Sequence, residues 1–194
     1  MRVVLFASDL GLHAMHAGAC GQVPTSHVVA RWSSPPVGWY KLNVDDVYDH
    51  LTSFVACKGL IREHGGIWVR GFVRSVCVCL PIEVELWAVH ESLVQAWMLG
   101  KGKKHVTVEV DSTLVLRLLS SHSHIVVSMT ILQHIFALLS GDWSVKFDNS
   151  FGEANIVPNK LAKSIVLYSL EFWVFIDPSL FILQLLHSNY IAAG

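Results

Sequence analysis

The chain has 194 residues, of which 53% are hydrophobic and only 15% are charged, and its formal net charge is −1 at pH 7. This composition excludes an intrinsically disordered chain and predicts a single domain with a core of ordinary size. The near-neutral charge excludes nucleic-acid binding by bulk electrostatics, so any such contact must be local.

Residues 1–31 show no clear period and are interpreted as a variable N-terminal segment. Only five apolar residues follow Arg2, fewer than a signal peptide contains, so secretion is not expected and nucleus and cytoplasm both stay open. The four cysteines are too sparse for a disulfide framework and are predicted to be reduced; they are Cys20, Cys57, Cys77 and Cys79. His13 and His16 lie near Cys20, but no second cluster completes a zinc site.

After Pro35 and Pro36, three segments alternate apolar and polar residues, which is typical of strands: residues 40–46, 59–62 and 68–73. The His-Gly-Gly tripeptide at 64–66 predicts a turn between the last two. Together they predict a three-stranded antiparallel meander.

Residues 82–100 change to a helical period, with Leu86, Val89, Leu93 and Trp97 on one stripe and Gly100 where a helix ends. Residues 105–110 predict a strand, and a second amphipathic helix follows as far as Leu119. Further along, residues 127–139 predict a helix, 143–147 a strand, and 153–170 a loop followed by a helix.

This order of elements predicts an α/β fold with a mixed five-stranded sheet, in which three antiparallel strands precede parallel strands and helices cover the faces. Residues 171–194 form an apolar C-terminal tail, interpreted as a packed helix and a second short apolar piece. Asp177 and Pro178 interrupt this tail before a membrane span accumulates, so no membrane contact is expected.

Three acidic residues stand where a predicted strand or helix begins or ends: Asp45, Glu85 and Asp111. Carboxylates that are scattered along a chain but gathered in space are what Mg²⁺ requires. Each residue also has a structural explanation. Asp111 could cap a helix, Glu85 could interact with a helix dipole, and Asp45 could be a solvated strand end.

Five blocks of sequence, in this order and spacing, resemble the plant ribonuclease H-like domains (ribonuclease H type 1) that are related to retrotransposon reverse transcriptases. They are PPVGWYKLNVDD at 35–46, KGLIREHGGIW at 58–68, ELWAVHESLVQAWMLG at 85–100, VTVEVDSTLV at 106–115 and EANIVPNKLAK at 153–163. The resemblance covers residues 32–170 and implies a ribonuclease H-like domain over that range.

The resemblance further implies hydrolysis of the RNA strand of an RNA–DNA hybrid, leaving a 3′-hydroxyl and a 5′-phosphate. Asp45, Glu85 and Asp111 match the family's catalytic carboxylates, which hold two Mg²⁺ or Mn²⁺ ions. Intact carboxylates at these three positions favour an active enzyme.

Other positions depart from the family pattern. Asn159 stands where the family has a fourth aspartate, Asn149 where it has a loop histidine, Gly152 where it has an arginine, and Asp46 where it has a glycine. Loss of the fourth charge implies a weaker second metal site. The alternative to a weakened enzyme is therefore an inactive nucleic-acid-binding or protein-binding module derived from a mobile element.

Several further residues are candidates for contact with nucleic acid. Lys101, Lys103 and Lys104, next to His105, could contact phosphates or form a solvated loop. Asn43, with Glu153 and Asn155, could read the 2′-hydroxyl of RNA. The tryptophans in the motif blocks are predicted to pack in the core rather than to stack on bases; they are Trp39, Trp68, Trp87 and Trp97.

Overall fold

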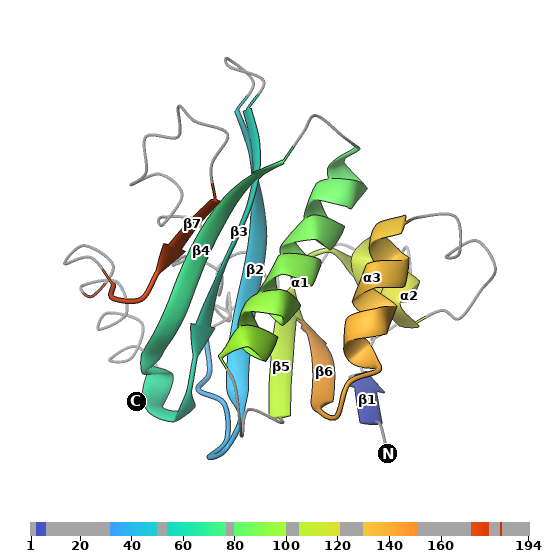
Figure 1. Ribbon diagram of the computed structural model, residues 1–194. Coiled ribbons are helices and arrows are strands. Elements are labelled where there is room, and N and C mark those ends of the chain that lie inside the picture. Colours follow the sequence, from blue (N-terminus) through green and yellow to red (C-terminus); the bar gives the residue numbers. More distant parts are fainter. Residues whose placement is uncertain are drawn as a thin grey trace, which may run out of the picture.

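A computed structural model describes residues 3–6, 32–49, 54–76, 80–99, 105–120, 130–150, 172–178 and 183. Within these residues, seven strands form one mixed sheet in the order β1-β6-β5-β2-β3-β4-β7 (Figure 1). The strands are β1 Val3–Phe6, β2 Tyr40–Asp49, β3 Phe54–Arg62, β4 Trp68–Val76, β5 His105–Val110, β6 Ser144–Asn149 and β7 Phe172–Phe175.

The five central strands confirm the predicted α/β fold. β2, β3 and β4 form the antiparallel meander, and β5 and β6 run parallel to β2 beside it. A short 3₁₀ turn at His64–Gly66 leads from β3 to β4. Gly65 and Gly66 have φ angles of 76° and 75°, a conformation that residues with a Cβ atom rarely adopt.

Two short edge strands extend the sheet beyond the predicted five. β1 pairs in parallel with β6, and β7 pairs antiparallel with β4. Residues 172–175, where the sequence predicted part of a packed helix, are therefore a strand. The run FWVF consists of four apolar residues without apolar-polar alternation, so its sequence gave no strand signal.

In the part of the chain that the structure describes, three helices lie against the sheet, namely α1 Pro81–Met98, α2 Thr113–Ser120 and α3 Thr130–Leu139. α1 crosses in front of β2 and β3, and α3 lies beside it (Figure 1). α1 begins with proline at its first position, and the Glu83 carboxylate accepts a hydrogen bond from the Leu80 N–H at 3.0 Å. None of the helices in the described residues is both long and apolar enough to cross a membrane.

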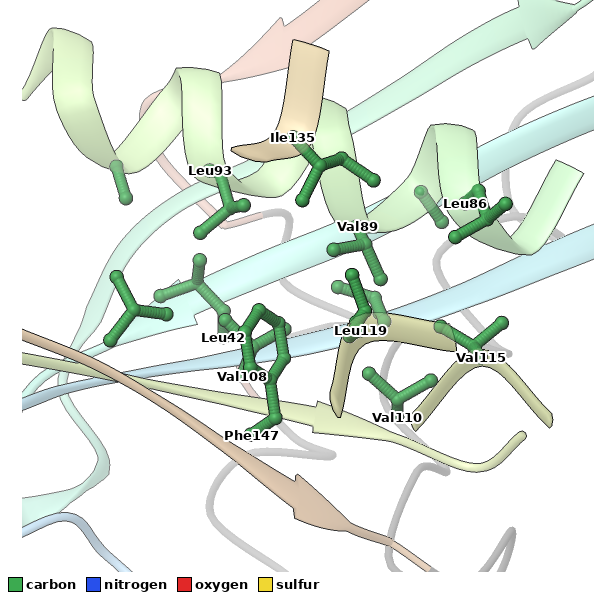
Figure 2. Close-up of a cluster of buried hydrophobic side chains, with 14 of the residues drawn as sticks. Leu42, Leu86, Val89, Leu93, Val108, Val110, Val115, Leu119, Ile135 and Phe147 are labelled. Atoms are coloured by element: carbon green, nitrogen blue, oxygen red, sulfur yellow. The ribbon is translucent and has the colours of Figure 1, made fainter. Parts of the chain in front are cut away.

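The hydrophobic core lies between the sheet and these helices, as Figure 2 shows. Leu86, Val89 and Leu93 of α1 are fully buried, as the helical stripe predicted, and pack with residues of the sheet and of the other two helices. The labelled partners are Leu42, Val108, Val110, Val115, Leu119, Ile135 and Phe147. Cys57 is a buried reduced thiol in this core, whereas the other three cysteines lie outside the described residues.

The prediction that Trp97 completes the buried stripe is wrong. Its side chain is 51% exposed, and its ring meets that of buried Trp143 edge to face at 5.3 Å. Trp87 is partly buried and packs against the core. Trp39 and Trp68 are also only partly buried, because they lie near strand beginnings at the margin of the sheet.

Candidate functional site

Two parallel strands bring Asp45 and Asp111 to the same end of the sheet. In the β2–β5 pair, Asn43 lies opposite Glu109. Asp45 lies two residues further along β2, and Asp111 directly follows the last residue of β5, so this pairing places both residues at the same end of the sheet. One strand pairing thus brings two residues that are far apart in sequence close together in space.

Glu85 approaches the same region from the second turn of α1. Its carboxylate accepts a hydrogen bond from the Ser112 side chain, and Ser112 directly follows Asp111. The Ser112 hydroxyl oxygen also accepts a hydrogen bond from the N–H of Val115, at 3.4 Å. Ser112 therefore caps α2. Asp111 does not cap this helix, although helix capping was the structural explanation that the sequence offered for it.

The three carboxylates influence one another electrostatically. Burial raises the pKa of Asp45, and the negative charge of Asp111 raises it further, against the opposing effect of Lys58. Burial is also the main cause of the raised pKa of Glu85, to which the charges of Asp111 and Asp45 contribute. Asp111 lies at the surface, yet desolvation by the surrounding protein raises its pKa too. Their ionisation is thus mutually unfavourable, as in sites that bind cations.

Asp46 belongs to this acidic group, and sequence reasoning had treated it only as a replacement for glycine. Among the neighbouring carboxylates, Asp46 has the largest charge effect on Glu85, and it also raises the pKa of Asp111. Alternation along β2 explains this, because Asp46 shares the face of Leu42 and Val44, which is the face that α1 covers. The Asp-Asp dipeptide was the signal that could have identified it.

Asp45 points to the opposite face of the sheet from Asp46 and is paired there with a lysine. Lys58 lies opposite Asp45 in the β2–β3 register, and its Nζ is 3.0 Å from Asp45 Oδ2. The side chains are only 2% and 9% exposed, respectively. Asp45 Oδ1 accepts a further hydrogen bond from the Asp46 N–H at 2.9 Å.

The donor types in this acidic group suit a hard divalent cation, but their arrangement does not bring three of them together. Glu85 Oε2 is a buried oxygen atom without a hydrogen-bond partner, which favours a cation as its partner. Among the described residues, however, no three His, Cys, Asp or Glu side chains are close enough to hold one ion. The ammonium of Lys58 already neutralises Asp45.

Next to the acidic group, a buried polar network occupies the same face of the sheet as Asp45. Asn43 donates a hydrogen bond to Glu109 and accepts one from Arg62 at 2.5 Å. Lys41 Nζ lies 2.8 Å from the Glu109 carboxylate, and the Arg62 guanidinium stacks 3.4 Å from the centre of the Trp32 ring. Asn43 is completely buried, so it holds the sheet together and cannot read a 2′-hydroxyl as the sequence suggested.

Of the remaining candidates, the structure describes Asn149 and His105. Asn149 is exposed at the end of β6, where it lies opposite Val110 and therefore next to the acidic end of β5. His105 begins β5, so it lies at the opposite end of that strand, roughly 20 Å from Asp111. The other candidates lie outside the described residues; they are Lys101, Lys103, Lys104, Gly152, Glu153, Asn155 and Asn159.

Comparison with known proteins agrees with this architecture. The family model described as reverse transcriptase-like matches residues 43–165. A protein of Arabidopsis thaliana named "Putative ribonuclease H protein" is 33% identical over 147 residues, which is 74% of this chain. The chain spans only 23% of that relative's length.

Solved structures of ribonucleases H share the fold. Ribonuclease H1 from Halobacterium salinarum superimposes with a TM-score of 0.53 at 14% identity, covering 66% of this chain and 99% of its own. The ribonuclease H domain from Mycobacterium tuberculosis gives a TM-score of 0.55 at 15% identity, covering 65% and 91%. LC11 ribonuclease H1 in complex with an RNA/DNA hybrid gives 0.53 at 16% identity, covering 63% and 92%. The chain belongs to the reverse transcriptase-like family, and its domain has the ribonuclease H fold.

Proposed function

We propose that this chain binds RNA–DNA hybrids and hydrolyses their RNA strand slowly, in the presence of Mg²⁺ or Mn²⁺. The main support for the proposal is geometric: the β2–β5 pairing and the Ser112–Glu85 hydrogen bond draw Asp45, Asp111 and Glu85, which are far apart in sequence, toward one end of the sheet. The name of the Arabidopsis relative and the hybrid-bound LC11 structure support the same substrate class.

In this proposal, Asp45, Glu85 and Asp111 are the residues that would hold the cations. Two bound divalent cations would supply an activated water and charge stabilisation at the scissile phosphate. Ser112 orients Glu85 through its hydrogen bond, and the Asn43–Glu109 contact keeps Asp45 level with Asp111. Asn149 and Asn159 supply neither a negative charge nor a titratable proton, so we expect slow turnover and a weak second cation.

A cleavage assay with a hybrid labelled on its RNA strand tests the proposal. Purified protein with millimolar Mn²⁺ should release products that carry 5′-phosphate and 3′-hydroxyl ends. Asp111→Asn should abolish the release, whereas Asp142→Asn, which changes an exposed aspartate in the turn before β6, should not. Intact hybrid after long incubation with the wild-type protein, with no gain in Asn159→Asp, would contradict the enzymatic proposal.

The second candidate function is a binding module without catalysis, and the buried Lys58–Asp45 ion pair favours it, because a lysine neutralises a proposed metal ligand. Fluorescence anisotropy with a labelled hybrid separates the two functions. A binding module retains the hybrid without cleaving it, and its affinity is the same in EDTA as in Mn²⁺.

A further inference from the structure

Among the described residues near Asp45, Glu85 and Asp111, Lys58 is the group whose position conflicts with a cation site. It lies on β3 directly opposite Asp45, its ammonium is 3.0 Å from Asp45 Oδ2, and its side chain is only 2% exposed. Lysine is almost never buried so completely unless a carboxylate pairs with it. The ion pair is therefore a fixed part of the sheet rather than a mobile surface contact.

The charge of Lys58 acts on more than one of the proposed ligands. It affects Asp45 through direct contact and Asp111 through space. Asp45 lies just beyond the β2–β5 pairing and Asp111 directly follows β5, so a cation shared by them would need the region that the ammonium already neutralises. A lysine ammonium is a compact point charge, comparable in role to a monovalent ion held by the chain itself.

We propose that Lys58 acts as a built-in cation that takes the place of one metal ion on Asp45 and keeps the metal affinity of the acidic group low. This inference rests on the proposed function only in its choice of metal ligands. A divalent ion that binds Asp45 must either displace the ammonium or stay beside a like charge, and both are unfavourable at this short distance. The side chain thus sets how strongly the domain takes up metal.

Mn²⁺ affinity, measured by calorimetric titration and by the electron paramagnetic resonance signal of free Mn²⁺, tests the inference. Lys58→Met, which keeps an unbranched side chain one atom shorter and removes its charge, should bind Mn²⁺ at least about tenfold more tightly than the wild type. Lys58→Arg keeps the charge and should remain weak. Lys41→Met is the matched control, because it removes a second buried lysine, paired with Glu109 at 2.8 Å, and should leave Mn²⁺ affinity unchanged.

The gain in Lys58→Met must depend on Asp45. The double variant Lys58→Met with Asp45→Asn should return to weak binding. If Lys58→Met binds Mn²⁺ no more tightly than the wild type, or if Lys41→Met gains as much, the inference is overturned.

Removal of Lys58 leaves a buried carboxylate without its partner and can prevent folding. Circular dichroism spectra recorded with and without Mn²⁺ show whether the Lys58→Met protein is folded. An unfolded Lys58→Met protein that folds on addition of Mn²⁺ supports the inference, because the ion replaces the ammonium. One that stays unfolded at millimolar Mn²⁺ contradicts it.

Failure of this inference and failure of the proposed function give different results. Tighter Mn²⁺ binding by Lys58→Met without any hybrid cleavage rejects the enzymatic function and supports the role of Lys58. Cleavage by the wild type together with unchanged Mn²⁺ affinity in Lys58→Met rejects the role of Lys58 and leaves the function intact.

Discussion

Asn43 donates a hydrogen bond to Glu109 across the parallel strands β2 and β5, and both residues are buried. Asp45 lies two residues after Asn43 on β2, and Asp111 lies two residues after Glu109, directly past the end of β5. A slip of one residue in this pairing would move one carboxylate to the other face of the sheet. The buried amide–carboxylate contact therefore fixes the register on which the candidate site depends.

Asn43→Ala should lower the free energy of unfolding by about 1–3 kcal/mol, because Glu109 loses one hydrogen bond and Arg62 another while both stay buried. Urea denaturation followed by circular dichroism measures the change. Asn149→Ala, at the exposed end of β6, is the control and should stay within about 0.5 kcal/mol of the wild type. Equal stability of the two variants would show that the buried network does not hold the register.

Leu119→Ala tests the packing of α2 on the sheet. Leu119 is buried in the core and its truncation should cost about 2–5 kcal/mol. Leu114 lies on the same helix but is 53% exposed, so Leu114→Ala should cost much less, about 0.5 kcal/mol. Thermal unfolding of both variants gives the comparison, and a similar loss in each would mean that α2 does not pack as described.

Glu85→Gln should stabilise the protein at pH 7, by no more than about 1 kcal/mol because the side chain is only partly buried. The folded protein raises the pKa of Glu85 above its ordinary value of 4.5, so its ionisation opposes folding at neutral pH. The unfavourable free energy of ionising Glu85 in the folded protein is present in full above the raised pKa. It decreases as the pH falls through the raised pKa and is absent below the ordinary pKa of 4.5. The advantage of Glu85→Gln should therefore vanish near pH 4, in unfolding curves recorded across this range without divalent metal.

An advantage of the same size at pH 4 and pH 7 would show that charge repulsion is not its cause. Ser112→Ala is a useful companion, because it removes the hydrogen bond that favours ionised Glu85. That variant should raise the pKa of Glu85 further.

Asn159→Asp restores the carboxylate that the family places at this position, although the residue lies outside the described part of the structure. We expect hybrid cleavage to increase by about tenfold, which corresponds to about 1.4 kcal/mol of activation free energy. Asn189→Asp makes the same chemical change in the C-terminal tail and should have no effect. Equal rates for both variants and the wild type would show that this position does not contribute to the site.

Sequence alone predicted the central architecture because its signals are local. The alternation of β2 and the helical stripe of Leu86, Val89 and Leu93 each reflect one buried face. The edge strands β1 and β7 were missed because each is a run of four apolar residues, VVLF and FWVF, without apolar-polar alternation. Trp97 was misplaced because periodicity indicates the face of a helix but not whether that face is covered at its last turn, where the Trp97 ring is 51% exposed beside Trp143.

The candidate site was only partly predictable for a different reason. Asp45, Glu85 and Asp111 could be selected as carboxylates at element ends, and family resemblance grouped them. The ion pair between Lys58 and Asp45 depends on the β2–β3 register, which no local pattern reports. Asn43 likewise looked like a polar residue available to a ligand, until strand pairing placed it between Glu109 and Arg62.

The most direct test of the central claim is the place where a paramagnetic ion binds. Mn²⁺ titrated into isotope-labelled protein should selectively broaden the amide resonances around Asp45, Glu85 and Asp111, and Asp111→Asn should reduce the effect. Broadening that is centred elsewhere, or that is the same in Asp111→Asn, would contradict the proposal that divalent cations bind at these carboxylates.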